Sequence, residues 1–163
     1  MKSIYIILDC MEFPRGTSFL VTGGAGFIGS NIVDKILYLG HKVKVLDNFS
    51  TGKIENIEEL LKDSNFELVE GDIREIDICR QVCKDVDYVI HQAAWGSVPR
   101  NIEMLVLYDN INVKRPLNMM QAARENNVKK FVYASLSAVY GDNLILPKQE
   151  GSEATVIINK KNK

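Results

Sequence analysis

The stretch FLVTGGAGFIGS, residues 19–30, constrains the fold of this chain more than any other feature. It places four glycines within seven positions, directly after an apolar run. Gly24, Gly26 and Gly29 form a G-x-G-x-x-G pattern, and Gly23, Gly26 and Gly29 form a G-x-x-G-x-x-G pattern. In such a turn the early glycines let the backbone approach a diphosphate, and the last one lets a helix lie against a sheet. The pattern therefore predicts a strand, a tight turn and a helix that begins at the turn.

An acidic residue follows this turn at the distance that a nucleotide-binding turn requires. Asp47 closes a second strand-like run, KVKVLD, about 20 residues beyond the glycines. A carboxylate at this position accepts hydrogen bonds from the hydroxyls of an adenosine ribose, and its charge repels a 2′-phosphate. The two features together favour a nucleotide site over the alternative, a tight turn that binds nothing, and they favour NAD over NADP.

The rest of the chain alternates between strand-like and helix-like segments. Strands are expected at Ser18–Thr22 and at residues 42–47, 66–72, 87–94 and 129–135. Helices are expected at Phe27–Leu39, Ile54–Lys62 and Glu75–Lys84, and Ile102–Asn126 is expected to be mostly helical. Such alternation predicts an α/β fold with a doubly wound, Rossmann-like, mostly parallel sheet that helices cover on both faces.

Charge and cysteine content argue against several classes of partner. The formal net charge of −1 does not favour nucleic acid or an anionic membrane. The apolar run after Lys2, IYIIL, is too short for a signal or membrane segment. The chain has three cysteines, Cys10, Cys79 and Cys83, and an odd number without framework spacing favours free thiols over disulfides. Free thiols are typical of a reducing cytoplasm, so a cytoplasmic protein is expected. Cys79 and Cys83 lie four residues apart, but two ligands without a nearby histidine favour buried thiols, so no metal is expected.

Five motifs occur together in a recognisable order: VTGGAGFIGSN, VLDNFSTG, EGDIRE, VIHQAA and SAVYGD. With them, residues 13–150 resemble the nucleotide-binding half of the extended short-chain dehydrogenase/reductases, in the NAD-dependent epimerase/dehydratase family. HQAAWGSVPR and the later LPK are most similar to UDP-N-acetylglucosamine and related UDP-sugar 4-epimerases. The resemblance implies NAD as cofactor and a UDP-sugar as substrate, which bound NAD oxidises transiently at C4. It also implies a lead-in at 1–17, an incomplete NAD-binding domain at 18–150 and a divergent tail at 151–163.

The resemblance implies roles for individual residues. Those expected around the cofactor diphosphate are Gly23, Gly26, Phe27 and Ile28, with Gly29 at the helix–sheet contact. Those expected along the rest of the cofactor are Asp47 and Asn48 at the ribose, Asp72 and Ile73 at the adenine, Ala93 and Ala94 toward the nicotinamide, and Asn112 beside the active site. Those expected near the sugar nucleotide are Ser97, Val98 and Arg100. Two alternatives stay open: Asp72 as a cap of the following helix, and Arg100 as a solvated loop charge.

The residues that carry catalysis in this family have poor counterparts here. Such enzymes use a Tyr and a Lys four positions apart on one helix, because the Lys lowers the pKa of the Tyr, together with a Ser or Thr. The only Y-x-x-x-K in the chain is YLGHK at 38–42, which a glycine interrupts. Tyr140 is followed four positions later by Leu144, and Leu136 stands where the family has its Ser or Thr. Ser137, beside it, is the one catalytic candidate.

Three interpretations are therefore open. The chain is the NAD-binding part of a UDP-sugar 4-epimerase that is not catalytically competent alone, a non-catalytic NAD-binding regulatory or interaction module, or an inactive decayed fragment. Relatives of the first kind are about twice as long, so the chain resembles a truncated member without the last strands and the substrate domain. A homodimer or an association with a full-length relative is expected, although Pro116, inside an expected helix, adds a kink.

Overall fold

The computed structural model describes residues 13–96 and 102–135. The chain divides into two compact units, Met1–Tyr133 and Ala134–Lys163, and the described helices and strands all belong to the first. Three residues expected near the substrate lie outside the described residues: Ser97, Val98 and Arg100. The catalytic candidate Ser137 and Cys10 also lie outside them. Their roles therefore stay predictions.

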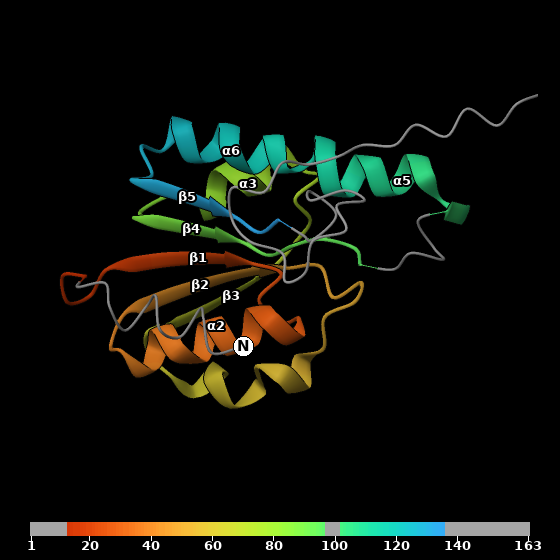
Figure 1. Cartoon of the computed structure of the whole chain (residues 1–163). Coiled ribbons are helices and arrows are strands. Elements are labelled where there is room, and N and C mark those ends of the chain that lie inside the picture. Colours follow the sequence, from red (N-terminus) through yellow and green to blue (C-terminus); the bar gives the residue numbers. More distant parts are fainter. Residues whose placement is uncertain (1–12, 97–101, 136–163) are drawn as a thin grey trace, which may run out of the picture. The chain divides into compact units, whose positions relative to one another are not determined.

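A five-stranded parallel sheet forms the centre of the first unit (Figure 1). Its strands are β1 (Ser18–Thr22), β2 (Lys42–Asp47), β3 (Phe66–Glu70), β4 (Tyr88–His91) and β5 (Lys130–Tyr133). They lie in the order β3-β2-β1-β4-β5, and every neighbouring pair is parallel. The chain thus moves outward from β1 in one direction and then in the other, which makes the end of β1 a topological switch point. The doubly wound, Rossmann-like fold predicted from the sequence is confirmed.

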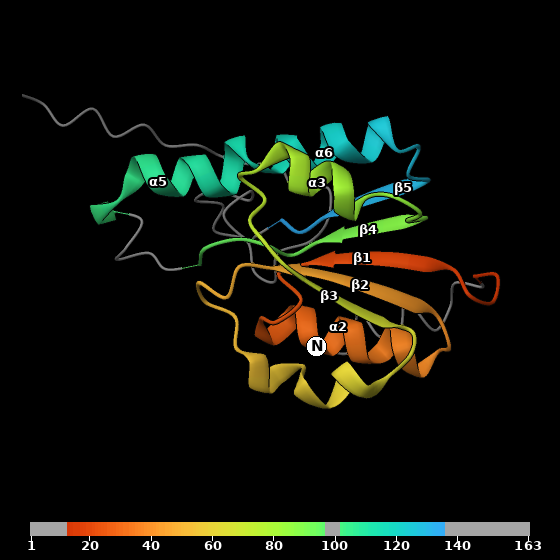
Figure 2. The same cartoon turned by 180° about the vertical axis from the view of Figure 1, so that it is seen from behind.

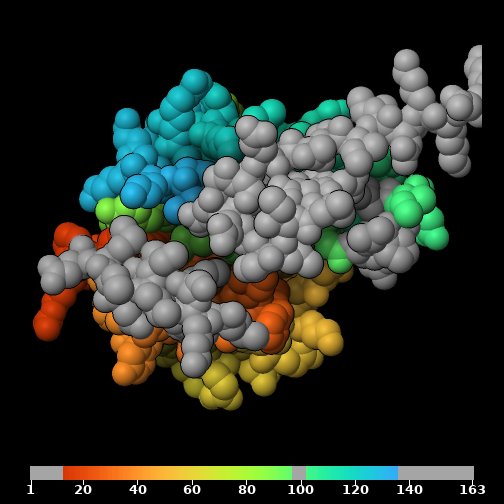
Figure 3. Space-filling view, in the orientation of Figure 1, coloured from red at the N-terminus to blue at the C-terminus, as the bar shows by residue number. Residues whose placement is uncertain are grey.

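Helices cover both faces of this sheet (Figures 1 and 2). The helix α2 (Phe27–Tyr38) packs on one face, and α3 (Ile76–Val82) and α6 (Pro116–Glu125) pack on the other. Alternate residues of β1 supply the two cores, because successive side chains of a strand point to opposite faces. Phe19 and Val21 belong to the core under α2, and Leu20 belongs to the core under α3 and α6. In the space-filling view α6 (cyan) and the segment 54–62 (yellow) lie at opposite borders of the molecule (Figure 3).

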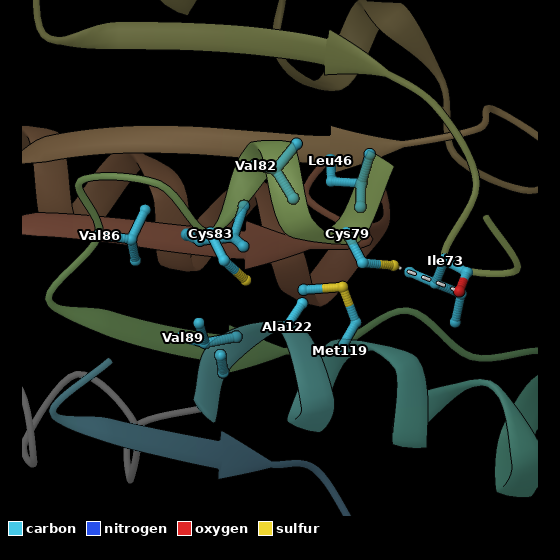
Figure 4. Packing of buried hydrophobic residues seen from close by; sticks show 11 residues of the cluster. Leu46, Ile73, Cys79, Val82, Cys83, Val86, Val89, Met119 and Ala122 are labelled. Carbon is cyan, nitrogen blue, oxygen red and sulfur yellow. Dashed lines mark hydrogen bonds between the residues drawn. The ribbon is translucent and has the colours of Figure 1, made fainter. Parts of the chain in front are cut away.

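The core under α3 and α6 contains both described cysteines (Figure 4). Cys79 and Cys83 are each fully buried and share this cluster with Met119 and Ala122 of α6. The Cys79 thiol donates a hydrogen bond to the carbonyl oxygen of Ile73, 3.4 Å away. The prediction that these two cysteines are buried thiols is therefore confirmed.

The helix predicted at Ile54–Lys62 is present, but it is not one continuous α-helix. The segment forms two short 3₁₀ helices, η1 (Ile54–Asn56) and η2 (Glu58–Lys62). Its beginning is bound to the glycine turn, because the Lys53 N–H and the Asn56 side-chain amide both donate to the carbonyl oxygen of Ala25, at 3.1 and 2.7 Å. Within the segment, N–H groups bond to the carbonyl three residues earlier, as in any 3₁₀ helix. The Asn56 N–H, for example, donates to the Lys53 carbonyl at 3.2 Å.

The predicted helical stretch at Ile102–Asn126 is confirmed for most of its length, with one interruption. The helix α5 (Leu105–Asp109) passes into a π-helical turn, η3 (Asn110–Lys114), and α6 then begins at Pro116. Proline has no N–H to donate, so it is best accommodated at the first position of a helix. The Arg115 N–H instead donates to the carbonyl of Asn110, five residues earlier, at 2.9 Å. Pro116 is thus preceded by a π-turn and begins the next helix.

The Y-x-x-x-K at 38–42 does not form a catalytic pair on one helix. Tyr38 is the last residue of α2 and is 81% exposed, whereas Lys42 is the first residue of β2. Gly40 between them has φ of +79°, a left-handed conformation that ends the helix. Across the described ranges 13–96 and 102–135, every helix is too short or too polar to span a bilayer.

Candidate functional site

The glycine turn joins β1 to α2 and leaves no room for a Cβ at Gly23 or Gly29. Gly23 has φ of +69°, and a Cβ there would lie 2.8 to 2.9 Å from backbone atoms of Gln92 and Ala93. A Cβ on Gly29 would lie 2.1 Å from the carbonyl oxygen of Gly23. Both contacts are closer than atoms tolerate, so the turn needs glycine at these positions. The structure thus explains the glycines that the sequence pattern singled out.

The first turn of α2 has N–H groups available for a ligand. No side chain caps this 12-residue helix, whose N-cap is Gly26. Uncapped N–H groups and the helix dipole make such an end favourable for an anion. Phe27 and Ile28, predicted at the diphosphate, have side chains that are 66% and 54% exposed. Contacts of these two residues with a diphosphate would therefore involve their backbone N–H groups.

A pocket of about 220 Å³ lies where β1, β2, β3 and β4 end. It brings together eight of the predicted cofactor residues: Gly23, Gly26, Asp47, Asn48, Asp72, Ile73, Ala93 and Ala94. Four other predicted residues do not line it: Phe27, Ile28, Gly29 and Asn112. Parallel strands place their carboxyl ends at one edge of a sheet, and there α/β proteins bind ligands at the switch point.

The same pocket contains residues that sequence reasoning did not identify. They are Leu46, Ser50, Thr51, Gly52, Gly71, Arg74, Gln92, Trp95, Leu107 and Ile111. Most lie within the motifs VLDNFSTG, EGDIRE and HQAAWGSVPR, so their place after a strand could have identified them. Leu107 and Ile111 come from α5 and η3, and the sequence gives no sign that these segments reach the pocket.

Asp47 is fixed by the backbone on either side of it. One carboxylate oxygen accepts a hydrogen bond from the Ala25 N–H in the glycine turn, and the other accepts one from the Phe49 N–H, each at 2.9 Å. The residue is 7% exposed and still lines the pocket. A carboxylate has about four acceptor sites, so these two bonds leave capacity for a ligand's hydroxyl groups.

Asp72 lies in a charged network at the next strand end. It accepts hydrogen bonds from the Asn48 side-chain amide at 2.7 Å and from the Arg74 guanidinium, whose Nη2 is 2.7 Å away. Burial by itself raises the pKa of Asp72, but the hydrogen bonds from Arg74 and Asn48 and the Arg74 charge outweigh burial and hold it below its usual value. The N-cap of α3 is Glu75, so the structure does not support the alternative of Asp72 as the helix cap.

Asn112 uses its side chain to hold the segment after β4. Its amide oxygen accepts a hydrogen bond from the Trp95 N–H, and its amide nitrogen donates to the Trp95 carbonyl, both at 2.9 Å. Its own backbone carbonyl accepts a hydrogen bond from the Tyr133 hydroxyl at 2.8 Å. In a regular α-helix that carbonyl would pair with the N–H four residues later, at Pro116, which has none. The proline therefore leaves a carbonyl that Tyr133 satisfies.

Trp95 extends from this anchored backbone across to another loop. Its indole N–H donates a hydrogen bond to the Ser50 hydroxyl at 3.2 Å. Its ring meets the ring of Tyr108 edge-on, with centroids 5.6 Å apart. Ser50 follows β2 and Trp95 follows β4, so the bond links strand ends that lie on either side of β1.

His91 is buried at the end of β4, beneath the site. Its Nδ1 lies 2.7 Å from the Thr22 hydroxyl, its Nε2 has no hydrogen-bond partner, and the residue is 1% exposed. Burial lowers the pKa of His91 to about 4, so the imidazole is neutral at physiological pH. Thr22 also accepts a hydrogen bond from the Ala93 N–H at 3.2 Å, which connects this pair to the pocket wall.

Acidic, histidine and cysteine side chains do not gather into a metal site in the part of the chain that the structure describes. What the pocket offers instead is the backbone of the glycine turn at Gly23 and Gly26, a buried carboxylate and a charged network. These groups suit a ligand that carries both a diphosphate and hydroxyl groups.

Comparison with known proteins agrees with this arrangement. The model of the NAD dependent epimerase/dehydratase family matches residues 19–162. The chain belongs to this family. The family resemblance predicted from the motifs is thereby confirmed, and NAD is the cofactor on which the family depends.

Individual members of the family show how far the similarity extends. A Methanocaldococcus jannaschii protein, provisionally named a UDP-glucose 4-epimerase, is 43% identical over 133 residues, which are 80% of this chain and 42% of that protein. A UDP-N-acetylglucosamine 4-epimerase from Methanobrevibacter ruminantium, solved with UDP-N-acetylmuramic acid, has a TM-score of 0.79 at 36% identity. The match covers 88% of this chain and 45% of that one. A UDP-glucose 4-epimerase from Bifidobacterium longum, solved with NAD+ and UDP, has a TM-score of 0.78 at 28% identity over 85% of this chain and 43% of that one. The chain thus spans less than half the length of these relatives.

Proposed function

We propose that this chain binds NAD in the pocket at the end of β1, as the NAD-binding part of a UDP-sugar 4-epimerase. The observation that carries the proposal is the convergence of the glycine turn and Asp47 on one pocket. Gly23 and Gly26 supply close backbone approach, and the uncapped start of α2 supplies N–H groups for a diphosphate. The family and the ligands named for its solved members support the same cofactor.

Each part of the cofactor has a group of residues suited to it. Asp47, with Asn48, binds the adenosine ribose by hydrogen bonds to its hydroxyl groups. The buried carboxylate of Asp47 repels a 2′-phosphate, so NAD is preferred over NADP. Asp72 and Ile73 bind the adenine. Ala93 and Ala94, after β4, flank the nicotinamide half, and Asn112 holds the adjacent backbone in position.

The bound cofactor supplies reversible hydride acceptance at C4 of a UDP-sugar. In the family the chemistry also needs a Tyr and Lys pair and a Ser or Thr. The sequence has one Y-x-x-x-K, at 38–42, whose Tyr38 ends α2 and whose Lys42 begins β2. Leu136 can neither donate nor accept a proton, so Ser137 is the one catalytic candidate. We therefore propose that these residues bind NAD without completing epimerisation, with Ser97, Val98 and Arg100 available to a UDP-sugar. A non-catalytic NAD-binding module of the cytoplasm, in a homodimer or with a full-length relative, is the second candidate.

Calorimetric titration with NAD tests the binding proposal. We expect wild-type protein to bind NAD, and Asp47→Ala to weaken binding by about 10-fold or more, because hydrogen bonds to a charged group are among the stronger ones. Tyr38→Phe is the control and should bind as wild type does, since Tyr38 is exposed at the far end of α2. Failure of wild-type protein to bind at millimolar NAD, or equal losses in both variants, contradicts the assignment. The same preparations should not interconvert UDP-glucose and UDP-galactose, and turnover by the purified chain would refute the second part of the proposal.

A further inference from the structure

We propose that Trp95 and Ser50 form a latch across the nucleotide pocket, which a dinucleotide has to open before it binds. The latch is the hydrogen bond from the Trp95 indole N–H to the Ser50 hydroxyl, 3.2 Å long. Both residues line the pocket. The inference rests on the proposed function, because it concerns entry of NAD into that same pocket.

The position of the two residues makes their bond a bridge. Ser50 lies three residues after the end of β2, and Trp95 lies four residues after the end of β4. In the sheet β1 lies between β2 and β4, and the glycine turn begins where β1 ends. A bond between the loops that follow β2 and β4 therefore crosses the carboxyl end of β1, which lies between them. That end is where a diphosphate would contact Gly23 and Gly26.

The two ends of the bridge differ in how firmly they are held. The backbone of Trp95 is fixed by both hydrogen bonds of Asn112, and its ring packs edge-on against Tyr108, which is 4% exposed. Ser50 is exposed, and its N–H bonds only within its own loop, to the side chain of Asn48 at 3.0 Å. Opening of the latch therefore moves the Ser50 side chain and leaves the indole in place. The indole then lies beside the entering ligand.

The size of the pocket supports an opening step. With the bond in place the pocket measures about 220 Å³, and pockets for drug-sized ligands measure about 300–1,000 Å³. NAD consists of two nucleosides joined through a diphosphate and is larger than most such ligands. The net free energy of an ordinary hydrogen bond is about 0.5–1.5 kcal/mol. Association slows by roughly 2- to 10-fold if such a bond must break before the ligand binds.

Two variants remove the latch from opposite sides. Ser50→Ala removes the acceptor, and Trp95→Phe removes the indole N–H while it keeps a ring against Tyr108. Stopped-flow measurements with NADH, followed by nicotinamide fluorescence, should show association about 2- to 10-fold faster in each single variant than in wild type. The double variant should be no faster than the faster single one, because one bond is lost in all three. Ser50→Thr, which keeps a hydroxyl, is the matched variant and should associate more slowly than Ser50→Ala.

A second readout does not depend on the ligand. Trp95 is the single tryptophan of the chain, so its emission reports the environment of the indole. We expect Ser50→Ala to shift the emission maximum of the unliganded protein and Ser50→Thr to leave it unchanged. Wild-type association rates in both single variants, or an additive effect in the double variant, would overturn the latch while NAD binding stands. Slower or weaker binding in Ser50→Ala alone would also overturn it, since Ser50 would then be a ligand contact. If no variant and no wild-type protein binds NADH, the proposed function fails as well.

Discussion

Asn112 and Thr22, the partner of His91, use their side chains to hold the backbone around the pocket in place by hydrogen bonds. Asn112 binds both polar groups of the Trp95 backbone, and the carbonyl that Pro116 leaves unpaired binds Tyr133. His91 pairs with Thr22, whose hydroxyl also accepts the Ala93 N–H. The segment after β4 is therefore held from beneath and from one side.

His91 predicts a loss of stability in mild acid. Its pKa is about 4 in the folded chain and about 6.5 when unfolded, so between these values the unfolded state binds the proton more strongly. The contribution of His91 to stability is full above pH 6.5 and declines as the pH falls toward 4. Urea unfolding should show a loss of about 2 kcal/mol between pH 7 and pH 5, where most carboxylates stay charged.

The two histidines provide a matched comparison for this prediction. Burial also lowers the pKa of His41, so it contributes in the same direction. The change between pH 7 and pH 5 should shrink most in His91→Gln and less in His41→Gln. Should His91→Gln fail to fold, the ring protons of His91 in wild-type protein still report its pKa by NMR. A midpoint near 6.5 in that titration would refute the account of His91.

At the level of elements, strands were predicted more reliably than the hydrogen-bonding type of the helices. Short apolar runs flanked by turn residues identify strands, because a strand of a parallel sheet is buried on both faces, as Phe19 and Leu20 of β1 are. Helical periodicity does not distinguish α from 3₁₀ or π bonding, so η1, η2 and η3 were not foreseen. Their form follows from tertiary bonds to Ala25 and from the missing N–H of Pro116, neither of which has a periodic signal.

The packing of Cys79 in α3 and of Cys83, the residue after it, predicts that both thiols are inert. Burial raises the pKa of Cys79 to about 12 and that of Cys83 to about 11, so very little reactive thiolate exists near neutral pH. In a Cys10→Ser chain, iodoacetamide at pH 8 should modify either thiol at least about 100-fold more slowly than a free cysteine. Both should react fully in urea. Mass spectrometry that finds fast native labelling of either cysteine would contradict the core packing of α3.

Across the whole molecule, the sheet order and the place of the pocket follow from general rules, and the contents of the pocket follow only in part. Alternating strands and helices with right-handed crossovers predict a switch point at β1, and the spacing of the glycines and Asp47 identifies the ligand edge. The Trp95–Ser50 bond and the approach of Leu107 and Ile111 depend on how loops and α5 fold back, which no local pattern encodes. The chain spans 42% of the length of one relative named as an epimerase and 45% of another. The activity of these whole enzymes is therefore only proposed for this chain.

A crystal structure of the protein with NAD is the most direct test of the central claim, that the glycine turn and Asp47 together bind a dinucleotide. We predict electron density for a diphosphate against Gly23, Gly26 and the start of α2, with ribose hydroxyls within hydrogen-bond distance of Asp47. An empty pocket at saturating NAD, or a dinucleotide bound elsewhere on the molecule, would contradict it.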